Sequence, residues 1–130
     1  MERSDVLKIT QCLQRVYTDL GPGYPESVYR KACEIEFQYN NISYESEVTM
    51  PIRYRGLCIS TVRADLIVEK KLIIELKAVC KISDLHITQT RRYLHHFDQT
   101  QAIVCNFPNT TESSNIETKV IEQSIFDNTQ

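Results

Sequence analysis

The chain has 130 residues, of which 42% are hydrophobic, and a formal net charge of -2. This length suits one domain, and the composition is sufficient for one hydrophobic core without disulfide cross-links. The charge gives no sign of the strongly basic surface on which sequence-independent nucleic-acid binding often relies. A nucleic-acid partner must therefore be predicted from a local site.

Five cysteines are spread along the chain without the close Cys-x-x-Cys or Cys/His spacing of zinc sites. We interpret them as small buried residues of a protein in a reducing compartment, the cytoplasm or the nucleus. No basic start precedes an apolar run, and no apolar stretch approaches the roughly 18 residues of a membrane helix. We expect an intracellular protein that is not secreted and has no membrane partner.

Two helices are expected at the start of the chain. Ser4 suits an N-cap, and apolar residues then recur at helical spacing over about four turns. The buried stripe of this helix should be Val6, Ile9, Leu13, Val16 and Leu20. Pro25 suits the first position of a second helix, which Asn40-Asn41 can end in a left-handed cap. The buried face of the second helix should be Val28, Ala32, Ile35 and Tyr39.

Residues 42–79 change to a strand pattern that is rich in β-branched and aromatic residues. Turn signals at Arg55-Gly56 and at residues 69–71 divide this segment, so we expect an antiparallel meander. Residues 66–68 and 72–74 are apolar on both faces of their strands. These two strands should therefore be central, with helices covering both sides of the sheet.

A third helix and a further strand follow the meander. Ser83 can cap a helix that runs to about Phe97, and residues 101–107 have the pattern of a short apolar strand. Together with the earlier elements, they predict an α/β (α+β) fold in which helices flank a central mixed sheet.

The tail from Pro108 is rich in polar residues. Its weak apolar pattern fits either a helix or a strand and comprises Ile116, Val120, Ile121 and Ile125. We expect one domain over residues 1–107 and an extension over residues 108–130 that packs on this domain or trails from it.

The two central strands carry charged residues beside their apolar runs. Because residues two apart on a strand share a face, Glu75 and Lys77 point to the same side. If the turn comprises residues 69–71, Asp65 lies opposite Glu75, with the two carboxylates about 5 Å apart on one face. A two-residue turn would instead place Asp65 opposite Leu76 and separate the charged groups.

Two carboxylates at this distance repel each other unless a cation lies between them, and their oxygens suit Mg²⁺ or Mn²⁺. Such a cation can bind a phosphate oxygen and lower the pKa of a water, while Lys77 orients that water or stabilises the transition state. The combination predicts hydrolysis of phosphodiester bonds. A Glu-x-Lys pattern also occurs in weak surface ion pairs, but the central position of these strands favours the catalytic interpretation.

Five sequence blocks follow one another along the chain. They are Gly23-Tyr24-Pro25-Glu26-Ser27-Val28-Tyr29, Arg63-Ala64-Asp65, Glu75-Leu76-Lys77-Ala78, Gln89-Thr90-Arg91-Arg92-Tyr93-Leu94 and Asn106-Phe107. Together they resemble the GxxExxY family of the PD-(D/E)xK nuclease superfamily. The resemblance implies a restriction-endonuclease-like core, in which a helix with an acidic residue packs beside a mixed sheet whose central hairpin holds Asp and Glu-x-Lys. The loop before Glu26 and Pro108 after the last block depart from the family pattern, which affects loop geometry and not the expected ligands.

The resemblance also implies a role for each polar residue of these blocks. The metal ligands would be Glu26, Asp65 and Glu75, and Lys77 would be the catalytic amine. Gln89 and Tyr93 match a Gln-x-x-x-Tyr motif that related exonucleases place beside the site. These two residues are one helical turn apart, so both can face one groove.

Other interpretations of single residues remain open. Arg63 shares the strand face of Asp65 and can contact phosphate or simply pair with an acid. Among the three histidines, His86 is the best candidate for substrate contact. Tyr29 and Tyr93 also fit ordinary core packing with a satisfied hydroxyl, and an acid at position 26 also suits a helix N-terminus.

These residues predict a metal-dependent nuclease that hydrolyses phosphodiester bonds in DNA, in preference to RNA, and acts on single strands or ends. The alternative is a non-catalytic module that retains the nuclease fold and binds nucleic acid or serves a structural role. A homodimer or a protein partner remains open. If the carboxylates are crowded, at least one of them should have a raised pKa in the absence of metal.

Overall fold

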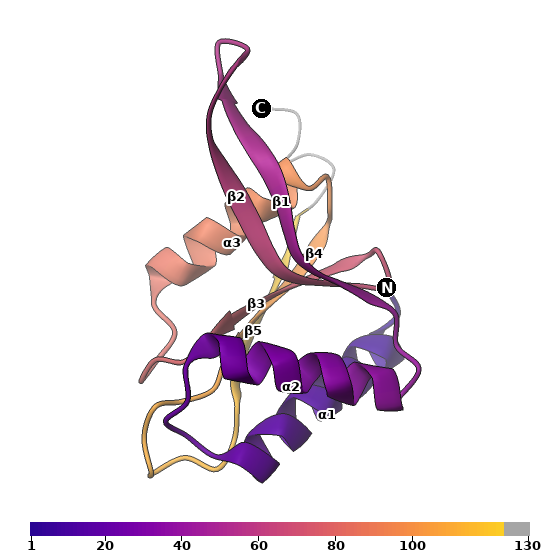
Figure 1. Cartoon of the computed structure of the whole chain (residues 1–130), viewed down its shortest axis with the longest axis vertical. Coiled ribbons are helices and arrows are strands. Elements are labelled where there is room, and N and C mark those ends of the chain that lie inside the picture. Colours follow the sequence, from indigo (N-terminus) through magenta and orange to yellow (C-terminus); the bar gives the residue numbers. More distant parts are fainter. Residues whose placement is uncertain (124–130) are drawn as a thin grey trace.

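The computed structural model describes residues 1–123 as three helices and one five-stranded sheet (Figure 1). In chain order the elements are α1 Arg3–Leu20, α2 Glu26–Tyr39, β1 Tyr44–Tyr54, β2 Leu57–Val68, β3 Leu72–Lys77, α3 Asp84–His96, β4 Gln101–Asn106 and β5 Glu117–Glu122. The predicted order of helices and strands is confirmed up to β4. Ile125, part of the weak apolar pattern of the tail, lies outside the described residues.

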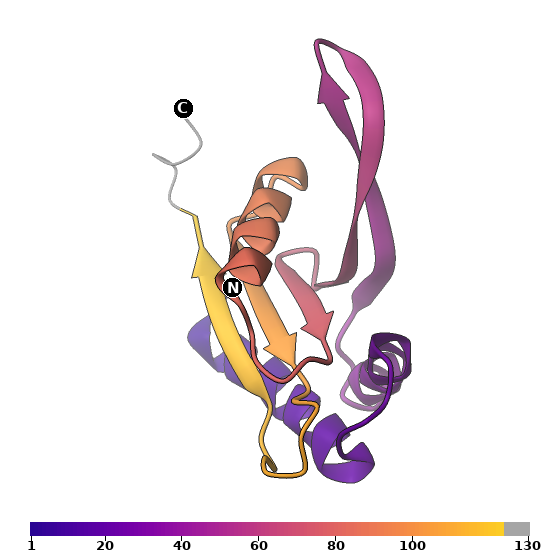
Figure 2. The same ribbon diagram turned by 90° about the vertical axis from the view of Figure 1, so that its left-hand side faces the viewer.

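The strands are ordered β1-β2-β3-β4-β5 across the sheet. The first three form the predicted antiparallel meander, β3 and β4 are parallel, and β5 pairs with β4 in the antiparallel direction. Helices α1 and α2 lie on one face of the sheet and α3 on the other (Figure 2). The predicted α+β class, with a mixed sheet flanked by helices, is therefore confirmed.

The turn between β2 and β3 has the predicted three residues. Two of them have left-handed backbone, and the Lys71 N–H donates to the Val68 carbonyl at 3.0 Å. Val68 pairs with Leu72, and the ladder continues in this register to Leu66 and Ile74. The next residues away from the turn are Asp65 on β2 and Glu75 on β3. The observed register is therefore the one that the predicted carboxylate pair requires.

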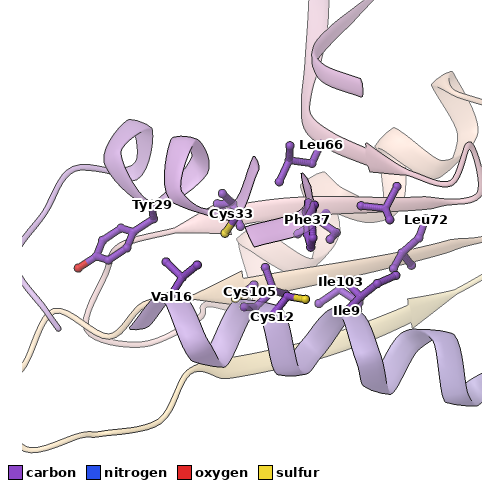
Figure 3. Packing of buried hydrophobic residues seen from close by; sticks show 14 of the residues in the cluster. Ile9, Cys12, Val16, Tyr29, Cys33, Phe37, Leu66, Leu72, Ile103 and Cys105 are labelled. Carbon is purple, nitrogen blue, oxygen red and sulfur yellow. The ribbon is translucent and has the colours of Figure 1, made fainter. Parts of the chain in front are cut away.

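Figure 3 shows the larger core, which lies between the sheet and the two N-terminal helices. On α1 the central residues of the predicted stripe are buried, and its two end residues are half-buried. The apolar runs of β2 and β3 are buried on both faces, because their alternate residues join the two separate core clusters. The central position predicted for these strands is confirmed.

The buried face of α2 differs by one position from the prediction. The expected residues were Val28, Ala32, Ile35 and Tyr39, and the observed ones are Tyr29, Cys33 and Phe37. Ile35 is 54% exposed and Tyr39 is 82% exposed. A shift of one residue turns a helix by about 100°, and the observed orientation buries two aromatic rings against the core. The larger apolar area of these rings decides which face packs inward.

Two helix starts also differ slightly from the prediction. The helix α1 has Glu2 rather than Ser4 as its N-cap, because the Glu2 carbonyl already accepts from two amides of the first turn. Pro25 is the N-cap of α2, not its first helical residue. The predicted cap Ser83 is confirmed, since its hydroxyl accepts from the His86 N–H at 3.3 Å.

The cysteines divide into two groups, and all five are free thiols. Cys12, Cys33 and Cys105 are buried in the larger core, as expected (Figure 3). Cys58 and Cys80 are exposed, and for these two the prediction of burial is wrong. One lies near the end of the β1–β2 hairpin and the other in the loop after β3, both outside the buried core clusters. In the described residues, no helix combines the length and the apolar character that crossing a membrane requires.

Residues 117–122 of the polar tail form a strand, which settles the choice between a helix and a strand for this segment. Ile121 is buried against the α3 side of the sheet, and Val120 is 56% exposed. The strand β5 therefore extends the same sheet that carries the charged residues of β2 and β3. The division at residue 107 stays a prediction.

Candidate active site

Asp65 and Glu75 lie side by side on β2 and β3 and are 9% and 5% exposed. The Asp65 N–H donates to Oε1 of Glu75 at 2.9 Å, and the Leu76 N–H donates to Oδ2 of Asp65 at 2.8 Å. Each carboxylate is thus fixed by a main-chain N–H group of the opposite strand. Within the described residues, no hydrogen bond reaches the second oxygen of either carboxylate.

The sheet opens at this point, which explains why side chains can reach these amides. The β1–β2 register pairs Ser46 with Leu66 and Val48 with Ala64, and the intervening pair is missing. Glu47 has a φ of 53°, a left-handed conformation that is costly for a residue with a side chain. The β2–β3 ladder also ends one residue before the carboxylates. Here the main-chain N–H groups of Asp65 and Leu76 donate to carboxylates instead of to carbonyls of a neighbouring strand.

Burial, and after it the neighbouring charge of Asp65, raise the pKa of Glu75 from 4.5 to about 8. The hydrogen bond from the Asp65 backbone and the charge of Lys77 act in the opposite direction, and Glu26 adds a smaller upward effect. The expectation that burial and like-charge repulsion raise at least one carboxyl pKa is borne out. A cation beside Asp65 and Glu75 would relieve both the burial and the repulsion.

Lys77 and Glu26 border this carboxylate pair. Lys77 is half-buried at the end of β3, on the same face as Glu75 and opposite Asn106 of β4. Glu26 is exposed and is the first residue of α2. Its charge raises the pKa of Glu75, so it lies within electrostatic reach. Among residues 1–123, no three His, Cys, Asp or Glu side chains are close enough together to hold a metal.

An ion-pair chain joins α2 to the two strands that separate here. Nη1 of Arg30 and Nη1 of Arg63 lie 3.1 and 3.2 Å from the same Glu47 oxygen. Nη2 of Arg63 is also 3.9 Å from Oδ1 of Asp65, and Arg30 is 3.7 Å from Glu34. Sequence reasoning missed Arg30 and Glu47. The only available signal was that Arg30 follows Glu26 by one helical turn.

Helix α3 brings Tyr93 to the same side of the sheet. Burial raises the pKa of Tyr93, and the negative charges of Glu75 and Asp65 raise it further. Gln89 is exposed one turn earlier on the helix. His86 is half-buried, and its Nδ1 accepts from the Ser83 N–H at 3.1 Å, completing the helix cap. Capping explains this histidine without a ligand.

The remaining motif residues hold the loops around the site. Tyr29 stacks on Phe107 with ring centroids 4.2 Å apart, and its hydroxyl donates to the Gly21 carbonyl at 2.6 Å. Core packing with a satisfied hydroxyl therefore accounts for Tyr29. The buried side chain of Asn106 accepts from the Val79 N–H and donates to the Val79 carbonyl, both at 2.9 Å. These bonds fasten the chain just after Lys77.

The donors present fit a divalent cation. Asp65 and Glu75 each keep one carboxylate oxygen without a hydrogen bond in the described residues, and a main-chain N–H group holds the other oxygen of each. Mg²⁺ commonly binds through one or two carboxylates and keeps several waters, so two buried carboxylates suffice. Sulfur and imidazole ligands, which zinc prefers, are absent from this pair of residues.

A model of the PD-(D/E)XK nuclease superfamily matches residues 4–119 of this chain. Since the match covers most of the sequence, the chain belongs to the PD-(D/E)XK nuclease superfamily. Nucleases of this class act on nucleic acids and generally use divalent metals. No protein with a curated function matches the sequence.

Among solved structures, the chain is similar to "Crystal structure of SSO0001", with 23% identity and a TM-score of 0.55. The similarity covers 76% of this chain and 50% of SSO0001, so the chain spans about half the length of that protein and shares its fold. An alkaline exonuclease from Laribacter hongkongensis, LHK-Exo, gives 9% identity and a TM-score of 0.41 over 86% of this chain and 76% of its own. A score this low does not establish a shared fold.

Proposed function

We propose that this chain is a metal-dependent nuclease of the GxxExxY family that hydrolyses phosphodiester bonds in DNA. The observation that carries the proposal is the buried Asp65–Glu75 pair, fixed by two main-chain amides beside Lys77. Burying two acids side by side is unfavourable unless they bind a cation or a proton. Superfamily membership supports the same chemistry.

Asp65 and Glu75 would hold Mg²⁺ or Mn²⁺ through their free oxygens, and Glu26 would add negative charge at the mouth of the site. When bound, the cation would polarise a phosphate oxygen and lower the pKa of an attacking water. Because Glu75 has a raised pKa without metal, cation binding there would release a proton near neutral pH.

The other polar residues would act on the phosphate and on the water. The Lys77 ammonium lies on the same strand face as Glu75, where it can orient the water and balance charge that builds up on the phosphate oxygens. Tyr93, whose raised pKa keeps its hydroxyl protonated, would donate a hydrogen bond to the substrate. Gln89, Arg63 and His86 are proposed to contact the bound strand, His86 through the ring nitrogen that the cap leaves free.

The test is cleavage of labelled single-stranded, double-stranded and circular DNA, and of RNA, with Mg²⁺, Mn²⁺ or EDTA. Lys77→Ala should lower the rate by at least about 100-fold, as the loss of one transition-state charge contact does elsewhere. Lys71→Ala, which removes an exposed lysine from the β2–β3 turn, is the matched control and should retain full activity. Equal rates for native protein and Lys77→Ala would overturn the proposed role of Lys77.

Thermal unfolding provides a measurement that does not depend on activity. Mg²⁺ or Mn²⁺ should raise the melting temperature of the native protein, because a ligand that binds only the folded state stabilises it. Asp65→Asn should abolish this shift. Its amide oxygen can still accept from the Leu76 N–H, so the fold should be kept. An absent shift, together with inactivity on all substrates, would favour the non-catalytic module.

A further inference from the structure

The outer part of the β1–β2 hairpin projects away from the rest of the protein (Figures 1 and 2). We call residues 48–64 the arm. At its base, Val48 and Ala64 pack with α3, and Ala64 is the only fully buried residue of the arm. Beyond them, Ile52 and Val62 are half-buried and the other residues are exposed. An isolated two-stranded ribbon is marginally stable in water, so contact with a partner would stabilise the arm.

The arm differs in charge from the rest of the chain. It contains Arg53, Arg55 and Arg63 and has no acidic residue, whereas the whole chain has a formal charge of -2. The remainder of the protein is therefore more acidic than the total suggests. A basic, solvent-exposed projection on an acidic protein is complementary to a polyanion.

The two faces of the arm are chemically distinct, because residues paired across the strands share a face. One face carries the pairs Thr49–Arg63, Pro51–Thr61 and Arg53–Cys58. The other carries the pairs Met50–Val62, Ile52–Ser60 and Tyr54–Leu57. Two of the three arginines thus lie on one polar face, and the opposite face is mostly apolar.

The polar face leads directly to the candidate active site. Arg63 precedes Asp65 by two residues on β2, and its Nη2 is 3.9 Å from Oδ1 of Asp65. At about 3.3 Å per residue, the eight residues from Leu57 to Asp65 reach roughly 25 Å from the site. At about 3.4 Å per base pair, this equals roughly seven base pairs of duplex.

We propose that the arm binds the sugar-phosphate backbone of a DNA duplex that flanks the bond cleaved at the candidate active site. A two-stranded β-ribbon is one of the two protein elements that the major groove of B-DNA admits. The inference rests on the proposed function and sharpens its substrate class: the cleaved strand, even if single-stranded or at an end, adjoins a duplex held by Arg53 and Arg55.

The first test compares Arg53→Ala/Arg55→Ala with a control that removes two equal charges elsewhere, Lys8→Ala/Lys119→Ala. All four side chains are exposed, so both double variants should fold. Fluorescence anisotropy in EDTA measures binding to a labelled duplex longer than the arm and to its single strand, without cleavage. The arm variant should bind the duplex at least about tenfold more weakly, and the slope of log affinity against log salt should fall by about 2.

The control and the single strand make this result specific. The control should change duplex affinity by less than about threefold, and the arm variant should change single-strand affinity equally little. Unchanged duplex affinity of the arm variant would overturn the proposal, and so would equal losses on duplex and single strand.

A gain-of-function pair tests which face is used. Thr61→Lys adds a charge to the polar face, and Ser60→Lys adds the same charge one residue away on the apolar face. Both positions are exposed. Thr61→Lys should strengthen duplex binding several-fold more than Ser60→Lys. Equal gains would indicate attraction that does not depend on the arm face and would contradict the assigned geometry.

The exposed apolar side chains Met50, Tyr54 and Leu57 make a second copy of this chain the competing occupant of the arm. Sedimentation of the native protein and of Tyr54→Ser/Leu57→Ser distinguishes a second copy of the chain from a DNA duplex as the occupant of the arm. A dimer that is lost in this variant, with duplex affinity unchanged in the arginine variant, would assign the arm to self-association.

Failure of this proposal and failure of the proposed function give different results. Metal-dependent cleavage with no effect of the arm variants on duplex binding would overturn the arm and leave the nuclease in place. Arm-dependent duplex binding without cleavage of any substrate would support the binding role of the arm and overturn the catalytic proposal. If the native protein does not bind duplex DNA, the proposed role of the arm is wrong.

Discussion

The two halves of strand β2 differ in burial and in the number of neighbouring strands. Residues 64–68 are buried between two layers of helices, and residues 66–68 pair with strands on both sides, whereas residues 57–63 pair only with β1 and are almost fully exposed. The change occurs within one residue of Asp65, where the sheet opens at Glu47. A single strand thus provides a rigid support for charged groups and, further out, a surface free to bind. The difference teaches that tertiary contacts, not local strand propensity, separate these two roles.

The largest expected contrast is in stability. Leu66→Ala removes a side chain that is 0% exposed and should lower the free energy of unfolding by about 2–5 kcal/mol. Leu57→Ala, on the same strand but 72% exposed, should change it by less than about 0.5 kcal/mol. Urea unfolding of both variants measures the contrast. Similar losses of unfolding free energy in the two variants would mean that the arm is packed in solution. The contrast between the two halves of β2 would then be wrong.

An effect of similar size is expected from pH in the absence of metal. The pKa of Glu75 is raised from 4.5 to about 8 by burial and by Asp65, so its protonated form stabilises the fold. This stabilisation is fully present below pH 4.5 and is lost as the pH rises through about 8. The loss should amount to a few kcal/mol, on the order of the pKa shift converted to free energy.

Glu75→Gln should remove this dependence, because a neutral amide can replace the protonated acid and still accept from the Asp65 N–H. In EDTA at pH 9 the variant should unfold at higher urea than the native protein, and near pH 4.5 the two should be similar. Chemical unfolding across this range is the measurement. A native protein whose stability does not fall between these pH values would contradict the crowded acidic site.

The smallest predicted change concerns Tyr93. Tyr93→Phe keeps the ring packed against Phe97 and the apolar cluster between α3 and the sheet and removes only the hydroxyl, so the rate of cleavage should fall about 5- to 10-fold. Tyr44→Phe, on the α1 and α2 side of the sheet, is the matched control and should leave the rate unchanged. Tyr93→Phe with full activity would assign Tyr93 to packing, the interpretation that also explains Tyr29.

Much of the fold could be predicted because its signals are local. The apolar runs of β2 and β3, the breakers around Pro25 and the cap at Ser83 all act within a few residues. The rotation of α2 was not predictable to one residue, because several faces offer apolar residues and the choice depends on how Tyr29 and Phe37 fit against Phe107 and Tyr44.

For the candidate site, the strand pattern alone determined that Glu75 and Lys77 share a face, and a three-residue turn was sufficient to bring Asp65 opposite Glu75. Only the tertiary structure decided that these acids are buried, that main-chain amides fix them, and that Arg30 and Arg63 meet at Glu47. Periodicity is a property of neighbouring residues, so the sequence carries it directly. Burial, a left-handed break in a strand and ion pairs between distant elements depend on how the layers pack, and packing is decided by the whole chain at once.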